Sequence, residues 1–204
     1  MKPNVKKAYF TSSKKRDYAR KYLSYLSEII ASMDVAIIEE IIKAIQETGR
    51  RGGIIYFIGN GGSASVASHY ANDMKIGARL PGAKPLNAVS LTDNISILTA
   101  LANDEGYEKV FVRQLEGILT PNDALMAFSV SGNSPNVLEA IRYASLLGAV
   151  TIGCTGFDGG ELKRAADIVL HIPTNHGEYG PAEDIFAIMG HLITSYLKIA
   201  DEQR

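Results

Sequence analysis

Apolar residues fall into short runs that alternate with segments of helical period along most of the chain. Five of these runs have the length of buried strands: 54–58, 86–91, 124–128, 149–154 and 168–172. Between and after them, apolar positions recur every three or four residues, which predicts helices at 63–77, 95–103, 107–119, 135–147 and about 181–200. This alternation predicts an α/β fold with a five-stranded parallel sheet and helices on both faces.

Two predicted helices precede the first strand. Apolar residues from Tyr22 onward repeat at helical spacing, and Asp34 is placed to cap a second helix. We interpret the chain as a single domain with a helical extension at 1–50 and an α/β core at 51–204. The opening segment is rich in basic residues, among them Lys6, Lys7, Lys14, Lys15, Arg16, Arg20 and Lys21. A solvated helix face explains them better than an RNA-binding arm, because no matching basic groove follows.

Composition narrows the class of protein. The formal net charge of −1 at pH 7 gives no reason to expect nucleic acid or an acidic membrane surface as a partner. Cys154 is the single cysteine, and it lies in a predicted strand, so we interpret it as a buried core residue rather than a nucleophile. No apolar run has the length of a membrane span, and the first residues lack the apolar core of a signal peptide. We therefore expect a protein of the reducing cytoplasm.

Two loops rich in glycine and serine each follow a predicted strand and precede a predicted helix. The first loop is Gly-Asn-Gly-Gly-Ser at 59–63, and the second is Ser-Val-Ser-Gly-Asn-Ser at 129–134. Glycine lets the backbone approach an anion closely. Serine hydroxyls donate hydrogen bonds to the anion, and so do the N–H groups at the start of the following helix. Neither loop contains lysine or arginine. The residues that we expect to bind a phosphate or its sugar are Asn60, Gly61, Gly62, Ser63, Ser129, Ser131 and Ser134.

The first loop also matches part of the dinucleotide-binding fingerprint, through Gly59, Gly61 and Ala64. That fingerprint needs an acidic residue about 20 positions later, at the end of the next strand. Here the next predicted strand ends near Asp93, which is about 30 positions on. A dinucleotide has no need of the second serine-rich loop, whereas a sugar phosphate can be held between both loops.

Further motifs carry a family resemblance. They are Leu-Thr-Asp at 91–93, Ala-Asn-Asp-Glu-Gly-Tyr at 102–107, Ser-Gly-Asn-Ser-Pro-Asn-Val at 131–137 and Thr-Gly-Phe-Asp-Gly-Gly at 155–160. With the first loop, they resemble the sugar isomerase (SIS) superfamily and, more closely, its phosphoheptose isomerase branch. The resemblance implies a flavodoxin-like three-layer sandwich and a homotetramer whose active sites lie at subunit contacts, partly built by the N-terminal helices. It also implies isomerisation of sedoheptulose 7-phosphate, or a similar long-chain ketose phosphate, to the aldose phosphate.

The resemblance also assigns roles to single residues. Active members are similar to this chain at His69 and His191, and they carry Glu at the position of Asp73 and Gln at the position of Glu183. These four positions bind zinc or transfer protons in such enzymes, which implies that Asp73 is the base and His191 its partner acid. Asp is one methylene shorter than Glu, by roughly 1.5 Å. The change leaves either a differently shaped site for another sugar or a weakened enzyme.

Residue spacing supports one half of this zinc set more than the other. His69 and Asp73 are four apart and share one face of a predicted helix. Glu183 and His191 are eight apart, about 12 Å of helical rise, which is long for two ligands of one ion. Either Glu183 lies in a loop before regular helix begins, or the two side chains serve sites in different subunits. Asp184 lies closer to the helix face of His191.

Other interpretations stay open beside the enzyme. Asp93 and Asn60 are candidates to bind sugar hydroxyls, and Glu183 is a candidate to bind substrate. A non-catalytic SIS-domain regulator or a phosphosugar-binding protein would share both loops, but regulators of replication initiation in this superfamily lack the acidic and histidine pair. The loop with His176, Glu178 and Tyr179 departs from the family pattern. It either borders the site and selects the sugar, or is an ordinary surface turn.

Overall fold

The computed structural model describes residues 4–77 and 86–202. Its single sheet has five strands, β1 (Ile54–Gly59), β2 (Asn87–Ser90), β3 (Ala124–Ser129), β4 (Val150–Thr155) and β5 (Ile168–His171). All neighbouring strands are parallel, and their order is β2-β1-β3-β4-β5. This is the flavodoxin-like order. The predicted fold class and all five predicted strands are therefore confirmed.

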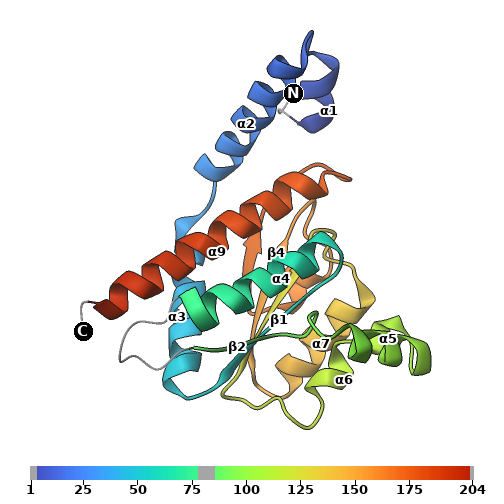
Figure 1. Cartoon of the computed structure of the whole chain (residues 1–204), viewed down its shortest axis with the longest axis vertical. Coiled ribbons are helices and arrows are strands. Elements are labelled where there is room, and N and C mark those ends of the chain that lie inside the picture. Colours follow the sequence, from blue (N-terminus) through green and yellow to red (C-terminus); the bar gives the residue numbers. More distant parts are fainter. Residues whose placement is uncertain (1–3, 78–85, 203–204) are drawn as a thin grey trace.

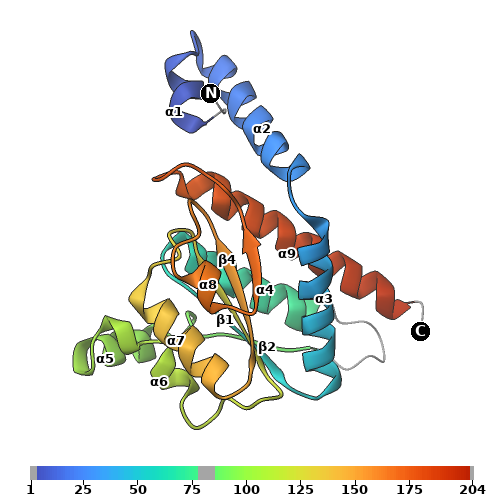
Figure 2. The same cartoon turned by 180° about the vertical axis from the view of Figure 1, so that it is seen from behind.

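Helices cover both faces of the sheet (Figures 1 and 2). One layer holds α3 (Val35–Arg50), α4 (Gly62–Asn72) and α9 (Tyr179–Glu202). The other layer holds α5 (Ile95–Asp104), α6 (Val112–Leu115), α7 (Pro135–Leu146) and α8 (Leu162–Ala165). Among the residues that the structure describes, no helix combines the length and the apolar character needed to cross a membrane.

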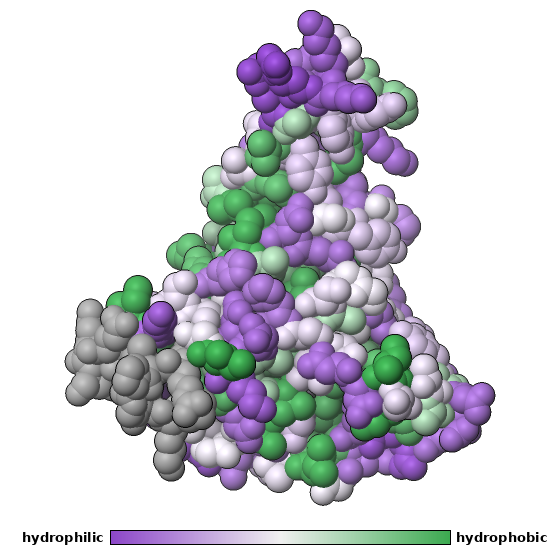
Figure 3. Space-filling view, in the orientation of Figure 1, coloured by the Kyte–Doolittle hydropathy of each residue, from purple (hydrophilic) through white to green (hydrophobic). Residues whose placement is uncertain are grey.

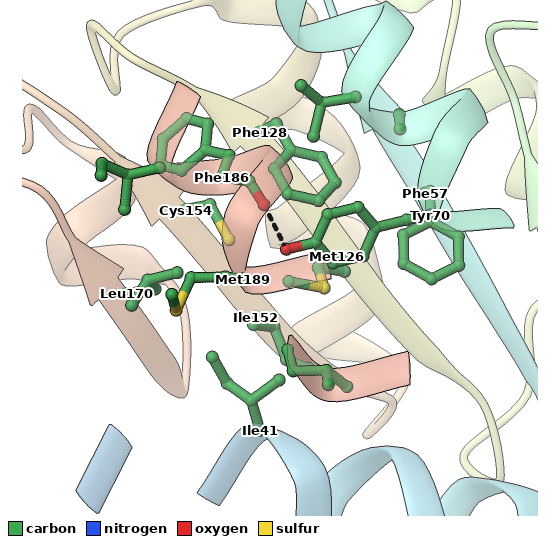
Figure 4. Close-up of a cluster of buried hydrophobic side chains, with 14 of the residues drawn as sticks. Ile41, Phe57, Tyr70, Met126, Phe128, Ile152, Cys154, Leu170, Phe186 and Met189 are labelled. Atoms are coloured by element: carbon green, nitrogen blue, oxygen red, sulfur yellow. Dashed lines mark hydrogen bonds between the residues drawn. The ribbon is translucent and has the colours of Figure 1, made fainter. Parts of the chain in front are cut away.

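Aromatic side chains join the sheet to α4 and α9 (Figure 4). The ring of Tyr70 on α4 lies 5.7 Å from that of Phe57 and 4.8 Å from that of Phe128, measured between centroids. The Tyr70 hydroxyl donates a hydrogen bond of 2.7 Å to the backbone carbonyl of Phe186 on α9. Cys154 is buried in the same cluster, and burial raises the pKa of its thiol. The interpretation of Cys154 as a core residue is confirmed.

Among the residues that the structure describes, three helices rather than the predicted two precede the sheet. The additional helix is α1 (Val5–Phe10), which is followed by α2 (Lys15–Ala31) and α3. The Asn4 side chain caps α1 by accepting a hydrogen bond of 2.7 Å from the backbone N–H of Lys7. Sequence periodicity missed α1 because a six-residue helix is too short to show a repeat. Helices α1 and α2 project away from the α/β body, and their outer end is hydrophilic (Figures 1 and 3).

Glu178 anchors these two helices to the segment that leads into α9. One carboxylate oxygen accepts a hydrogen bond of 2.7 Å from the backbone N–H of Val5 on α1. The other accepts bonds of 2.9 Å from the Tyr25 hydroxyl on α2 and 3.0 Å from the Asn175 side chain. Glu178 is only 8% exposed. It is therefore a buried anchor, whereas His176 and Tyr179 of the same loop are exposed.

The predicted helix at 107–119 is broken into two short pieces. A 3-10 turn covers Tyr107–Lys109, and α6 covers only Val112–Leu115. The Gln114 side chain donates a hydrogen bond of 2.7 Å to the backbone carbonyl of Val110. In a continuous α-helix this carbonyl would accept a hydrogen bond from the backbone N–H of Gln114. That N–H bonds to Phe111 instead. The side chain thus competes with the helical ladder, which an apolar pattern cannot reveal.

The two glycine- and serine-rich loops leave neighbouring strands at one edge of the sheet. Strand β1 ends at Gly59 and pairs there with Phe128 of β3, just before the second loop. The chain order reverses at β1, which places both loops at the topological switch point, where open α/β sheets bind ligands. Gly132 fixes the second loop: its φ is +65°, and a Cβ there would lie 1.9 Å from the backbone oxygen of Gly159. Only glycine allows this close contact between the loops after β3 and β4.

Replacing Gly132 by alanine should therefore displace the second loop. A matched control is Gly117→Ala, since Gly117 has a φ of +78° but a Cβ added there would meet no atom within 4 Å. We expect the control to lose about 1 kcal/mol of unfolding free energy through the left-handed backbone alone. Gly132→Ala should lose about 1–3 kcal/mol more through overpacking. Urea unfolding of both variants measures the difference, and equal losses would show that the loop contact is unimportant.

Candidate active site

The first loop leads directly into α4 and is covered by Glu183 from α9. Gly61 has a φ of +56° and precedes the first residue of α4. The buried Ser63 hydroxyl donates a hydrogen bond of 2.9 Å to a Glu183 carboxylate oxygen. A Cβ on Gly62 would lie 2.2 Å from the other oxygen of that carboxylate. Glu183 therefore lies against the N-terminus of α4, where a helix attracts anions.

The second loop brings its serine side chains together. The hydroxyls of Ser129 and Ser134 are 3.2 Å apart, and Ser134 immediately precedes α7. The Ser131 hydroxyl accepts a hydrogen bond of 3.3 Å from the backbone N–H of Asn133. Two predicted phosphate-binding serines, Ser129 and Ser134, are thus close in space at the start of a helix, and Ser131 lies between them in the same loop.

Asn60 links the first loop to the second. Its side chain forms two hydrogen bonds of 2.9 Å with the side chain of Asn136, each amide donating to the other. The Tyr107 hydroxyl donates a further bond of 2.9 Å to the Asn60 oxygen. Sequence reasoning singled out neither Asn136 nor Tyr107. Both lie in motifs that carried the family resemblance, but a motif does not show which residues bond to each other.

Asp93 follows β2 and lies beside α4. One of its oxygens accepts a short hydrogen bond from the Ser68 hydroxyl. Asp93 is exposed and lines a hollow of about 420 Å³ together with Ser68, Asn72 and Lys75. The Asp93 carboxylate is therefore accessible to a ligand that enters this hollow.

Three of the four predicted zinc ligands meet at one point between α4 and α9. The Nε2 atom of His69 lies 3.1 Å from Oδ2 of Asp73 and 3.0 Å from Nε2 of His191. The Nε2 atom of His191 lies 3.7 Å from the same Asp73 oxygen. The three ligand atoms all lie within 4.8 Å of one another. Both histidines are exposed and Asp73 is half-buried, so a ligand has access to this group.

Close packing of the two helices produces this meeting. A Cβ at Gly190 would lie 2.6 Å from the ring of Tyr70, so the glycine lets α9 approach α4 directly over that ring. His69 precedes Tyr70, and His191 follows Gly190. Asp73 begins η1 (Asp73–Gly77), a π-helical turn that continues α4. Such turns are frequent at functional sites.

The donor set of this group fits a metal ion. Two imidazole nitrogens and one carboxylate oxygen are a common set in catalytic zinc sites, where a further position stays open for water or substrate. Among the described residues, Glu183 and Asp184 do not belong to the group. Asp184 instead accepts a hydrogen bond of 2.6 Å from the Tyr22 hydroxyl on α2. Because α9 already begins at Tyr179, Glu183 lies within regular helix, and the alternative that placed it in a preceding loop is wrong.

Comparisons with known proteins agree with this architecture. Residues 17–156 match the SIS domain family. The chain is 42% identical over 142 residues to a phosphoheptose isomerase of Trichlorobacter lovleyi, covering 69% of this chain and 71% of that protein. It is 38% identical over 178 residues to a phosphoheptose isomerase of Chlorobaculum parvum, covering 87% of this chain and 85% of that protein.

A solved structure extends the likeness to three dimensions. The phosphoheptose isomerase of Neisseria gonorrhoeae superposes with a TM-score of 0.80 at 28% identity, over 89% of this chain and 95% of that one. The likeness therefore extends over most of the chain. The chain belongs to the SIS-domain family, and within it resembles the phosphoheptose isomerases.

Proposed function

We propose that this protein is an aldose-ketose isomerase of the cytoplasm that converts sedoheptulose 7-phosphate, or a similar long-chain ketose phosphate, to the aldose phosphate. The observation that carries the proposal is the meeting of His69, Asp73 and His191 at one point. His69 and Asp73 lie on and at the end of α4, which begins at the first loop, and His191 lies on the neighbouring helix α9. Along α4, Ser63 and His69 are six residues apart, or about 9 Å. An open seven-carbon chain spans roughly 8 Å between its ends. A phosphate at the loops would thus place the far end of the sugar near the three side chains.

Asp73 and His191 would perform the proton transfers. Conversion of a ketose to an aldose moves one proton from C1 to C2 and another from O1 to O2. In our proposal the Asp73 carboxylate takes the proton from C1 and returns it to C2. The His191 imidazole takes the proton from O1 and gives a proton to O2. His69, 3.1 Å from Asp73, holds the carboxylate in place. A zinc ion held by His69, by one oxygen of Asp73 and by one nitrogen of His191 would supply a Lewis acid for the sugar's carbonyl oxygen, and the other Asp73 oxygen and the other His191 nitrogen would then transfer the protons.

Removing the base tests the proposed activity. We expect Asp73→Asn to lower kcat for sedoheptulose 7-phosphate by about 10²- to 10⁴-fold, because the amide cannot accept the C1 proton. The matched control is Asp34→Asn, which makes the same chemical change at the N-cap of α3, where asparagine caps equally well. NMR spectra of the reaction measure appearance of the aldoheptose 7-phosphate. Unchanged turnover by Asp73→Asn would remove the assigned base, and absence of turnover by the unmodified protein would exclude this substrate.

The metal would be zinc, held by three side chains rather than the four that the resemblance implies. Loss of a residue that only hydrogen-bonds to a metal ligand typically weakens metal binding by ~10- to 100-fold. His69 would bind the metal directly, so we expect His69→Ala to weaken zinc binding by more than this. Glu183→Gln should leave zinc affinity unchanged, since its carboxylate contacts Ser63 and lies outside the ligand group. Titration of chelator-treated protein with zinc measures both affinities. A large loss in Glu183→Gln would restore the four-ligand set.

We also propose that four copies assemble, as the resemblance implies. Between α3 and α9 an open groove of about 480 Å³ is lined mainly by apolar side chains, among them Val35, Ile42 and Leu192. Val35 is 74% exposed. Hydrophobic side chains also gather on the surface below the projecting N-terminal end (Figure 3). Covering this surface with a second copy would remove apolar area from water.

Light scattering tests the assembly. The protein should have four times the mass of one chain in solution, and Val35→Glu should reduce that mass by placing a charge in the apolar groove. Leu146→Glu is the matched control, because Leu146 is 83% exposed on α7, which packs against the other face of the sheet. A monomer of the unmodified protein, or equal behaviour of both variants, would contradict the proposal.

A further inference from the structure

Two asparagine side chains connect the loops on either side of the switch point. Asn60 belongs to the loop after β1, and Asn136 is the second residue of α7, just past the loop after β3. Each amide nitrogen lies 2.9 Å from the oxygen of the other amide. Asn60 is half-buried, whereas Asn136 is only 1% exposed. Substrate between the loops can therefore reach Asn60 but not Asn136.

A neighbouring backbone group decides which way both amides face. A reciprocal amide pair by itself is satisfied equally well when both side chains are turned over, because each nitrogen and oxygen then exchange places. The Asn136 oxygen, however, also accepts a hydrogen bond of 2.9 Å from the backbone N–H of Val137, which can only donate. This bond fixes the oxygen of Asn136. The nitrogen of Asn60 must then face that oxygen, and the orientation of Asn60 follows.

The fixed orientation limits what Asn60 can offer a ligand. Its oxygen already accepts two hydrogen bonds, from the Asn136 amide and from the Tyr107 hydroxyl. An amide oxygen has two lone pairs, so this acceptor is fully used. One N–H of the Asn60 nitrogen is engaged by Asn136, and the other stays available. Asn60 therefore presents only a donor, which suits a phosphate or hydroxyl oxygen of the substrate.

We propose that Asn136 is a positioning residue of the sugar-phosphate site, acting through Asn60. It turns the Asn60 amide so that its N–H faces the ligand and its oxygen faces away from a negatively charged group. Without Asn136, rotation of Asn60 would place a carbonyl oxygen toward the phosphate in part of the molecules, and affinity would fall. This inference rests on the proposed function, because it places an anionic sugar phosphate between the two loops.

Binding of inorganic phosphate tests the inference without any turnover. We expect Asn136→Ala to weaken phosphate binding by about tenfold, the equivalent of one hydrogen bond. Asn60→Ala should have a similar effect, and the double variant should be no weaker than Asn60→Ala, since Asn136 acts only through Asn60. The matched control is Asn87→Ala, which removes an exposed asparagine at the start of β2, away from the carboxyl ends of the strands. Calorimetric titration with phosphate measures all four variants.

Kinetics separate positioning from a general structural role. In an active enzyme, Asn136→Ala should raise KM for sedoheptulose 7-phosphate by about tenfold and leave kcat nearly unchanged, because ground-state and transition-state binding of the phosphate are lost equally. A fall in kcat at constant KM would overturn the proposal, as would additive losses of phosphate affinity in the double variant. Weaker phosphate binding by Asn136→Ala, in a protein that shows no turnover, would contradict the proposed isomerase and still support the positioning role of Asn136.

NMR of the unmodified protein provides a measurement that needs no stable variant of Asn136. The side-chain amide signals of Asn60 and Asn136 should exchange slowly with solvent, because each has one N–H in the pair. Added phosphate should shift one proton of Asn60 and leave the buried amide of Asn136 in place. Rapid exchange of both amides, or absence of any shift on Asn60 with saturating phosphate, would overturn the proposal.

Discussion

The contact between Gly190 and the ring of Tyr70 is the constraint on which the candidate active site depends. A Cβ at position 190 would lie 2.6 Å from the ring, a distance that no side chain can adopt without moving the helix. The Tyr70 hydroxyl reinforces the contact by bonding to the carbonyl of Phe186, one turn earlier in α9 (Figure 4). Because His69 and His191 are the direct neighbours of these two residues, the spacing of the helices sets the 3.0 Å between their Nε2 atoms.

The two loops, where we expect the phosphate to bind, contain no positively charged side chain. Neither loop carries a basic residue, so its attraction for an anion depends on helix N-termini, hydroxyls and amides. The carboxylate of Glu183 already lies against the first loop. The Ser63 hydroxyl has a single proton, so it can donate either to Glu183 or to a phosphate. A phosphate bound by Ser63 therefore requires that Glu183 give up this bond, and neutral donors such as the Asn60 N–H gain importance.

Much of the fold follows from local pattern, because buried parallel strands are short apolar runs and their helices repeat at a period of 3.6. Pattern also placed His69 and Asp73 on one helix face. It missed α1, which is too short for a repeat, and the break near Gln114, which depends on one side chain bonding to a backbone carbonyl. The residues that hold distant segments together were equally hidden: Glu178 bonds to Val5 across 173 positions. Such pairings depend on tertiary structure, which no local spacing encodes.

The shorter acid at position 73 lies close to both histidines. The resemblance gives active relatives a glutamate here, and loss of a methylene suggested either a reshaped or a weakened site. Asp73 nevertheless brings one oxygen to 3.1 Å from His69 and 3.7 Å from His191, while its other oxygen accepts a bond of 3.2 Å from Asn72. It does so as the first residue of a π-helical turn, while its own backbone N–H still bonds to the carbonyl of His69 as in an α-helix. The aspartate at the end of α4 thus places its carboxylate beside both histidines although it is one methylene shorter than glutamate.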